Sequence, residues 1–314
     1  MIFRTFIPSM QPKLAVIMLT YNSAKHLPVF FQCMAKQTYK QYTLFILDNH
    51  SEDNSVAITE QQELPIVLIK NETNVGFAKG NNLAIAMALD ADYEFILLLN
   101  NDIECDEFLF ENMVQKLTAS EEHQLLSPKI LFYPQTEYIW YAGCLFDKYK
   151  GNNTIIRGLY EHDNGQYDTP ETMDFAPACC LLFHRKVLET VGLFDEKYFA
   201  YYEDADLLFR VKTQSKYKLL YSPDIKMYHK VGGSFNARQD LKNVNQFTFG
   251  NQYIHLTTRN FVYYLLKQKL FWSYCYLLVF FFRMQARFFF SGKYKVNLKT
   301  YRLLLRSYFE GFVL

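Results

Sequence analysis

Four apolar runs alternate with segments of helical pattern in the first hundred residues, and this alternation limits the possible fold more than any other feature. The runs cover residues 14–19, 42–47, 65–69 and 93–99, and helical patterns fill residues 24–37 and 77–89, with a shorter helix ending near residue 61. Strands that alternate with helices of this length form parallel sheets with helices on both faces. The sequence therefore predicts an α/β fold with a mostly parallel sheet flanked by helices.

Beyond residue 100 the pattern changes to shorter strand-like segments. We predict a helix from about residue 106 to 118, strands at residues 125–132, 138–141 and 175–183, helices at residues 185–191 and from about residue 204, and final strands at residues 218–221 and 225–229. A chain of 314 residues can hold one large α/β domain and an appendage. The predicted division places the α/β domain at residues 1–235 and a helical C-terminal region at residues 236–314.

The first candidate site follows the fourth apolar run, where Asn100 and Asn101 precede Asp102. Open α/β sheets bind ligands just beyond the carboxyl ends of their strands, and a carboxylate there suits a hard divalent cation that also holds a diphosphate. The alternative is a solvated helix start, where acids favour the helix dipole. That alternative is preferred for Asp106 and Glu107, whereas the metal role is preferred for Asp102.

The second candidate site is a group of three acids, Glu203, Asp204 and Asp206, which follows an aromatic run at residues 198–202. Acids this close to one another and to aromatic rings should include one with a raised pKa, and such a carboxylate is a candidate general base. The alternative is an N-cap and first helical turn. Both can hold, because a helix start fixes a carboxylate rigidly.

His229 ends the last predicted strand and precedes the flexible sequence Gly232-Gly233-Ser234. A lone histidine is more often structural than a ligand, so its local sequence alone disfavours a metal role. Asn74, Gly76 and Asn81 lie at a loop–helix junction, but the chain has neither a GxGxxG nor a GxxxxGK[ST] motif there. A dinucleotide site or a P-loop is therefore disfavoured.

The charge distribution is uneven. The net charge is only +1, which argues against a nucleic-acid partner, yet residues 262–314 hold nine Lys or Arg against one Glu. Residues 270–282 are uncharged but too short to cross a bilayer, and basic residues repeat at helical spacing beside apolar ones after residue 298. We expect this region to lie on a membrane surface; a buried oligomer interface or packing on the core is the alternative.

Two features bear on the compartment. The six cysteines show neither metal-type spacing nor a disulfide framework, which favours a reducing environment, and the first dozen residues lack the apolar segment of a secretion signal. We therefore expect a cytoplasmic protein, peripheral on the inner face of the cell membrane.

Taken together, residues 14 to 235 resemble family 2 inverting glycosyltransferases with the GT-A fold, particularly the rhamnosyltransferase-like members that build bacterial surface polysaccharides. Each motif is short, but their order and spacing are specific. The motifs are Thr20-Tyr21-Asn22, Asp48-Asn49-His50-Ser51-Glu52-Asp53, Asn74-Val75-Gly76-Phe77, Asn81-Asn82, Asn100-Asn101-Asp102, Gly192-Leu193-Phe194-Asp195-Glu196, Tyr202-Glu203-Asp204-Ala205-Asp206-Leu207 with Arg210, and His229 to Ser234.

The resemblance implies a role for each candidate residue. Asp102 looks like the last acid of the DxD motif, with Asn in place of the preceding acids, His229 becomes a second ligand for Mg²⁺ or Mn²⁺, and Asp204 matches the catalytic base. The residues implied to bind the sugar nucleotide are Thr20, Tyr21, Asn22 and Asp48 around the nucleotide, with Asp48 facing the pyrimidine, and Asn74, Gly76, Asn81 and Asn101 along the donor.

The expected activity is inverting transfer of one sugar from a nucleoside-diphosphate sugar, either dTDP-rhamnose or a UDP-sugar, to a hydroxyl of a glycan acceptor, which we expect to be polyprenyl-linked. The QxxRW motif of processive synthases is absent, which indicates one sugar per encounter. A non-catalytic sugar-nucleotide or glycan-binding protein on the same fold is the alternative. A nucleotidyltransferase is disfavoured, because Thr20-Tyr21-Asn22 is not a basic, glycine-rich triphosphate loop.

Overall fold

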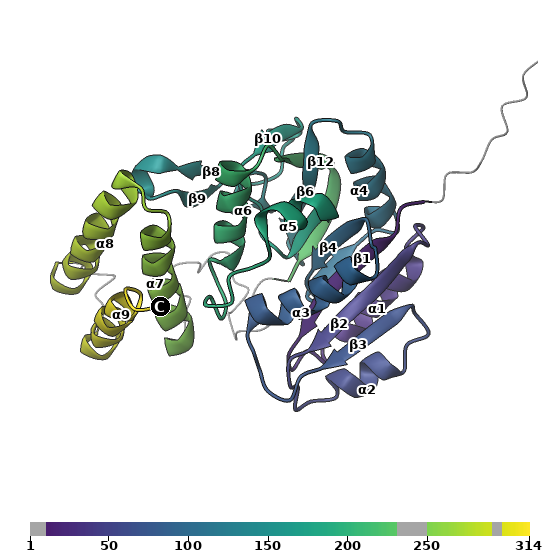
Figure 1. Ribbon diagram of the computed structural model, residues 1–314, viewed down its shortest axis with the longest axis horizontal. Helices are drawn as coiled ribbons and strands as arrows, with labels where there is room; N and C mark the ends of the chain where they lie inside the picture. The colour runs from purple at the N-terminus through teal and green to yellow at the C-terminus, as the bar shows by residue number, and fades with distance from the viewer. Residues whose placement is uncertain (1–10, 231–249, 291–296) are drawn as a thin grey trace, which may run out of the picture.

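A computed structural model describes residues 11–230, 250–290 and 297–314 (Figure 1). A ten-stranded sheet forms its centre, with the path β10-β12-β6-β11-β4-β1-β2-β3 and with β5 and β7 attached to β12 and β6. The first seven elements are β1 (Leu14–Thr20), α1 (Leu27–Lys36), β2 (Tyr42–Asp48), α2 (Ser55–Glu60), β3 (Ile66–Lys70), α3 (Phe77–Asp90) and β4 (Phe95–Leu99).

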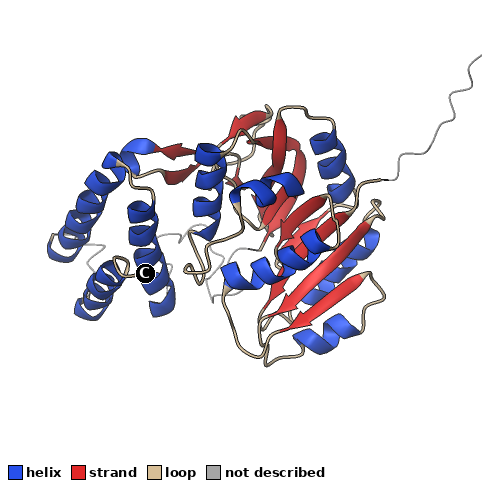
Figure 2. Cartoon of the chain, in the orientation of Figure 1, coloured by secondary structure: helices blue, strands red, loops and turns tan. Residues whose placement is uncertain are grey.

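Strands β3, β2, β1 and β4 run parallel, and their carboxyl ends meet at one edge of the sheet. The apolar side chains of β1 and β4 are buried on both faces, as expected for strands covered by helices on each side. In Figure 2, α3 crosses in front of these strands and α1 lies behind them. The predicted α/β fold with a mostly parallel central sheet flanked by helices is confirmed.

The second half of the sheet contains antiparallel strands. Strand β11 pairs antiparallel with both β4 and β6, and β12 then runs parallel to β6. The elements are β5 (Ile103–Cys105), α4 (Leu109–Thr118), β6 (His123–Phe132), β7 (Ile139–Tyr141), β8 (Cys144–Asp147), a 3-10 turn η1 (Lys148–Lys150), β9 (Asn153–Ile156), β10 (Glu171–Met173), β11 (Cys180–His184), α5 (Arg185–Val191), α6 (Glu203–Gln214) and β12 (Lys218–His229).

Several predicted strand boundaries in this half were wrong. The two final strands are one, β12, whose pairing with β6 shifts register between Ser222 and Lys226. The predicted strand at residues 175–183 is regular only from Cys180, and the short strands β8, β9 and β10 were not predicted. Strands of three or four residues are too short to show periodicity, so only their long-range pairing defines them.

The C-terminal region consists of three helices, α7 (Asn251–Lys267), α8 (Phe271–Phe289) and α9 (Leu298–Glu310), which lie on the left of Figure 1 beside α6. Side chains of α7, among them Val262 and Leu265, are buried within the same apolar cluster as the sheet. None of the helices within the described ranges is long and apolar enough to pass through a bilayer. The predicted boundary between residues 235 and 236 falls in residues 231–249, outside the described residues, so the two-part division stays a prediction.

A charged cluster also ties α7 to the rest of the chain. Lys267 Nζ of α7 lies 2.6 Å from Asp195 Oδ2 and 2.8 Å from Asp206 Oδ1, and Arg210 Nε of α6 lies 3.0 Å from Asp206 Oδ2. The Asp206 side chain is only 5% exposed, so these cations compensate a buried negative charge. Helix α7 is therefore part of the structure that holds α6, which carries Asp204.

Candidate functional site

The carboxyl ends of β1 and β2 bring Thr20 opposite Asp48. Both residues are buried, and Thr20 Oγ1 and Asp48 Oδ1 have no hydrogen-bond partner in the part of the chain that the structure describes. Asp48 Oδ2 accepts a hydrogen bond from the amide of Ser51 at 3.0 Å. Buried polar atoms are normally paired, so these two atoms mark a position where a polar ligand would complete the structure.

Tyr21 and Asn22 form the loop after β1. Tyr21 is 47% exposed. Asn22 adopts a left-handed conformation, with φ of 49°. Its amide donates to Ser51 Oγ at 2.9 Å, and its side-chain oxygen accepts from the amide of Glu52 at 2.8 Å. Asn22 thus fastens the loop after β1 to the loop after β2, while the Tyr21 ring is available at the surface.

Asn49 connects the predicted donor loop to the end of β2. Its Nδ2 donates to Asn74 Oδ1 at 2.7 Å, and its Oδ1 accepts from the amide of Val75 at 2.9 Å. Asn74 Oδ1 also accepts from the amide of Gly76 at 3.0 Å. The sequence interpretation gave Asn49 no site role; its position directly after the strand-end Asp48 was the available signal.

Gly76 brings the donor loop against the aromatic segment that precedes α6. Its φ is +86°, and a Cβ at this position would lie 2.4 Å from the backbone oxygen of Phe199. The amide of Phe77 donates to that same oxygen. A close approach of two backbones at a positive φ requires glycine.

We expect Gly76→Ala to lower the free energy of unfolding by about 2 to 4 kcal/mol, through backbone strain and displacement of Phe199. Thermal or urea unfolding measures the loss. Gly250→Ala is the control, since a Cβ there meets nothing within 4 Å. Equal stability of the two variants would show that the contact with Phe199 is not rigid.

Two other predicted donor residues use their amide groups inside the protein. Asn81 Nδ2 donates to the Phe77 carbonyl at 2.8 Å. Asn101 Nδ2 donates to the Leu19 carbonyl at 3.0 Å and to Ser23 Oγ at 3.1 Å. These bonds hold α3 and the ends of β1 and β4 in place, so in this structure both residues act as supports, and their donor contacts remain predictions.

Asp102 and His229 come together because β5 pairs antiparallel with the end of β12, which places His229 opposite Ile103. Asp102 Oδ1 lies 3.2 Å from His229 Nε2, and both side chains are about one-tenth exposed. Burial raises the pKa of Asp102, but the imidazoles of His229 and His26 outweigh burial, so the pKa lies below its usual range. The Trp140 ring packs against the imidazole, with centroids 4.8 Å apart.

The atoms of this pair fit a divalent cation. Asp102 Oδ1 and both ring nitrogens of His229 are buried and, among the described residues, accept or donate no hydrogen bond of acceptable geometry. A carboxylate oxygen and an imidazole nitrogen are suitable ligands for Mn²⁺, and the carboxylate also suits Mg²⁺. The described residues contain no group of three or more His, Cys, Asp or Glu that could hold a metal ion, so a cation here would take its remaining ligands from substrate and water.

Asp204 lies in the first turn of α6 and is partly exposed, whereas Glu203 beside it is buried. Burial raises the pKa of Asp204 to about 6, although the backbone amides of Ala205 and Ala178 counteract part of this rise. Burial, followed by the charge of Asp204, raises the pKa of Glu203 well above its ordinary value. The two neighbouring carboxyl groups therefore both have raised pKa values, and Asp204, with a pKa of about 6, is mostly ionised at neutral pH.

The segment before β11 lies between the two parts of the site. The amide of Asn100, two residues before Asp102, donates to the Cys179 carbonyl at 3.0 Å. The backbone amide of Ala178 lowers the pKa of Asp204 through a hydrogen bond. Burial raises the pKa of the Cys179 thiol, and Asp102 and Asp204 both add to this rise. The two carboxylates therefore both lie near residues 178–179.

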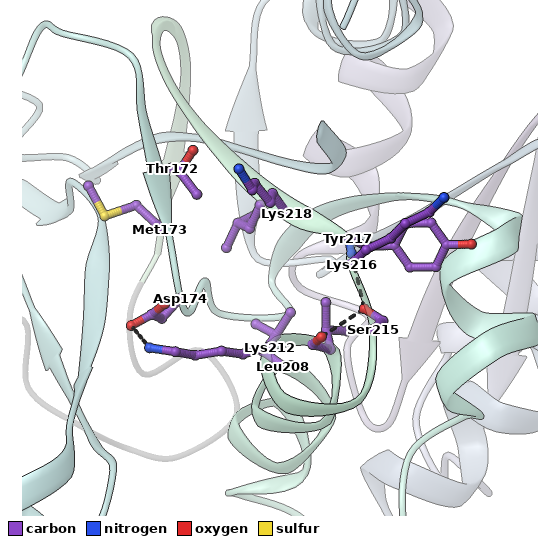
Figure 3. Close-up of a pocket in the computed structure, with 11 residues that line it drawn as sticks. Thr172, Met173, Asp174, Leu208, Lys212, Ser215, Lys216, Tyr217 and Lys218 are labelled. Carbon is purple, nitrogen blue, oxygen red and sulfur yellow. Dashed lines mark hydrogen bonds and ion pairs between the residues drawn. The ribbon is translucent and has the colours of Figure 1, made fainter. Parts of the chain in front are cut away.

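Figure 3 shows a different cavity, of about 350 Å³, at the C-terminal end of α6. Lys212 ion-pairs with Asp174 at its edge, with 2.6 Å between Nζ and Oδ2. Asp204 lies at the opposite end of α6, and none of the predicted site residues lines this cavity. It is separate from the candidate active site.

Solved structures show how widely this architecture occurs. The chain is similar to S. aureus TarS in complex with UDP-GlcNAc (TM-score 0.57, 17% identity, 94% of this chain and 79% of that chain). It is also similar to the mannosyltransferase PcManGT from Pyrobaculum calidifontis in complex with GDP-Man and Mn²⁺ (TM-score 0.56, 14% identity, 98% and 87%). The chain therefore has the GT-A fold of sugar-nucleotide transferases.

Sequence comparison narrows this class. The profile of glycosyl transferase family 2 matches residues 15–192, more than half of the chain. The chain belongs to glycosyl transferase family 2, and the predicted family and enzyme class are confirmed.

Two relatives whose names state an activity share 28% and 22% identity with this chain. A low-salt glycan biosynthesis hexosyltransferase, Agl10, of Haloferax volcanii is 28% identical over 148 residues, which cover 45% of each chain. The N-acetylglucosaminyl-diphospho-decaprenol L-rhamnosyltransferase of Mycobacterium tuberculosis is 22% identical over 240 residues, covering 69% of this chain and 75% of that protein. The match thus spans about half the length of the first relative and three quarters of the second.

Proposed function

We propose that this glycosyltransferase moves one sugar, with inversion at the anomeric carbon, from a nucleoside-diphosphate sugar to a hydroxyl of a lipid-linked glycan. One observation carries the proposal. The ligand atoms of the Asp102–His229 pair are buried without a hydrogen bond among the described residues, and Asp204 has a pKa of about 6. Asp102 and Asp204 are both close enough to Cys179 to raise the pKa of its thiol. A site for the leaving diphosphate and a proton acceptor are what single displacement at a sugar carbon needs.

Different residues of the chain carry out different parts of the proposed reaction. Asp204 takes the proton from the acceptor hydroxyl as that oxygen bonds to the anomeric carbon, and the nucleoside diphosphate leaves from the opposite face. The raised pKa of Glu203 favours its neutral form and so limits the negative charge beside the base. Asp102 and His229 would hold Mg²⁺ or Mn²⁺, which neutralises charge on the leaving diphosphate.

The donor is proposed to place its base near Asp48 and Thr20 and its diphosphate near Asp102. The unpaired Asp48 Oδ1 can accept the imide N–H of uracil or thymine, which supports a UDP-sugar or dTDP-rhamnose. The M. tuberculosis relative is named as a rhamnosyltransferase, and the S. aureus structure contains UDP-GlcNAc, so both donor types are represented among similar proteins.

The acceptor is proposed to be a polyprenyl-diphosphate-linked glycan, as in the name of the M. tuberculosis relative. The outer faces of α8 and α9 expose large apolar side chains, among them Phe282 and Phe309 at 66% and 58%. Basic side chains lie beside them, which is typical of helices that rest on an anionic membrane surface. We therefore propose that the enzyme rests on the inner face of the cell membrane.

Incubation with a panel of UDP- and dTDP-sugars, Mn²⁺ and a lipid-linked acceptor tests this function. We expect transfer from one donor class with inverted configuration, and slower release of nucleoside diphosphate without acceptor. A protein that binds donor and never releases nucleoside diphosphate would be the non-catalytic binding module.

A second experiment tests the cation. We expect EDTA to abolish transfer and Mn²⁺ to restore it, and Asp102→Asn to require about tenfold more Mn²⁺ or to stay inactive, since the variant loses the only carboxylate of the pair. Asp106→Asn is the control, because Asp106 Oδ1 only accepts a bond from the amide of Phe108. Full activity in EDTA would remove the metal from the mechanism.

A further inference from the structure

A groove of about 380 Å³ lies between α7, α8 and α9, and none of the residues predicted to bind the donor or the metal lines it. Tyr202, the residue that caps the N-terminus of α6, lines one part of it. The walls are aromatic: the Tyr202 ring stacks on Phe261 with centroids 5.3 Å apart, and Phe261 meets Phe280 edge to face at 4.9 Å. Asp204 is two residues from Tyr202, so this part of the groove adjoins the proposed base.

The groove also carries two positive charges. Arg283 and Arg287 are four residues apart on α8 and line the same wall. Arg283 Nη1 donates to the Tyr276 hydroxyl at 3.1 Å. Over the described ranges, no carboxylate lies within 4.0 Å of either guanidinium, whereas Arg306 on neighbouring α9 pairs with Glu310. Two guanidinium groups without a counter-ion favour an anion with several oxygens, and a diphosphate fits this geometry.

The two arginines stand at the border between the groove and the outer surface of α8. They also line a shallower pocket of about 310 Å³ with Ala286 and Phe290. The outer face of α8 exposes Phe271, Leu278 and Phe282, at 72%, 60% and 66%. This order of apolar face, guanidinium groups and aromatic groove matches a lipid whose chain lies in the membrane interface and whose diphosphate lies at the headgroup level.

We propose that this groove is the acceptor site, in which Arg283 and Arg287 bind the diphosphate of a lipid-linked glycan. The isoprenoid-type chain then follows the outer face of α8, and the sugar attached to the diphosphate extends along the groove toward Tyr202 and Asp204. The assignment rests on the proposed function, which it completes by giving the acceptor a place separate from the donor.

Binding of farnesyl diphosphate to the full chain tests the groove. The titration is done by calorimetry in detergent, with saturating UDP and Mn²⁺ to fill the donor site, and farnesol serves as the uncharged comparison. We expect farnesyl diphosphate to bind and farnesol to bind at least about tenfold more weakly. The double variant Arg283→Gln/Arg287→Gln should lose about tenfold or more in affinity for farnesyl diphosphate, because two charge-assisted contacts are removed.

Arg302→Gln is the matched control, since Arg302 is an exposed cation on neighbouring α9 that does not line the groove. It should leave farnesyl diphosphate binding unchanged. An unchanged melting temperature confirms that the double variant is folded, and if it does not fold, each single variant is measured. Equal losses in the double variant and in Arg302→Gln, or no loss in the groove variants, would overturn the proposal.

Turnover separates this proposal from the function on which it rests. In the double variant we expect KM for the lipid-linked acceptor to rise about tenfold, while donor KM and acceptor-independent donor hydrolysis stay unchanged. No donor turnover in the unmodified enzyme would refute the proposed function. Normal donor turnover with an unchanged acceptor KM in the double variant would refute only the groove.

Discussion

Replacing Asp204 with Asn is expected to lower the turnover number by about 10² to 10⁴-fold and to leave donor affinity unchanged. The amide keeps the shape of the carboxyl group but cannot take the acceptor proton. Steady-state transfer measures turnover, and displacement of a fluorescent nucleotide measures donor affinity. Glu203→Gln is the control: burial raises the pKa of Glu203 and favours its neutral form, which the amide resembles, so most activity should remain.

The pH dependence follows from the same residue. Because burial raises the pKa of Asp204 to about 6, kcat/KM should increase with pH through about 6 and level off above it. In the Asn variant this inflection should disappear from the residual rate. An Asp204→Asn enzyme with the original turnover, or the original pH profile, would remove Asp204 from the role of base.

The free energy of unfolding should change with pH in the direction opposite to kcat/KM. The folded state binds the Asp204 proton more tightly than the unfolded state, so the free energy of unfolding falls as the pH rises from about 4 to about 6. The Asn variant does not ionise and should lose this contribution to the pH dependence. Its melting temperature at pH 7 should thus equal or exceed that of the unmodified protein, which separates lost chemistry from lost structure.

Replacing Asn260 with Leu is expected to lower the free energy of unfolding by about 2 to 5 kcal/mol and to reduce turnover as well. Asn260 of α7 is fully buried, and its Nδ2 donates to the carbonyls of Ala200 and Tyr201 at 2.7 and 2.9 Å. Leucine leaves both carbonyls without this donor. Tyr201 and Tyr202 each have φ of 72°, a left-handed conformation that persists only where neighbours enforce it, and Asp204 follows two residues later.

Thermal unfolding and turnover at a temperature where the variant is folded test this expectation. Gln252→Leu is the control, since Gln252 is an exposed residue of the same helix. It should change neither property by much. If Asn260→Leu melts with the unmodified protein and turns over normally, then the aromatic segment keeps its conformation without α7.

The parallel half of the fold could be predicted because its signals are local. Each of its strands is a mainly apolar run. Asp48 follows one run directly and Asp102 follows another after two asparagines, so the edge at which they meet was predictable. His229 required the family resemblance, since its pairing with Asp102 depends on β5 and β12, which are far apart in the sequence.

The supporting residues could not be predicted for the same physical reason. Asn260 lies in a helix whose pattern indicates an ordinary amphipathic segment, and its partners are about sixty residues away. Lys267 was counted with the basic residues of a membrane-facing region, whereas the structure pairs it with Asp195 and Asp206. A side chain that pairs with a backbone group or a charge far away in the sequence leaves no recognisable pattern in the residues around it.

The connection between α7 and the segment before Asp204 also limits how enzymes of this type can be recombined. A chimera that exchanges the C-terminal helices to change acceptor preference must carry matching partners for Asn260 and Lys267, namely residues 195–206 of the same parent. Without these partners, the imported helices would not support the segment before Asp204, and the buried charge of Asp206 would lose one of its cations. Crossover points between relatives should therefore keep these two stretches together as one inherited unit.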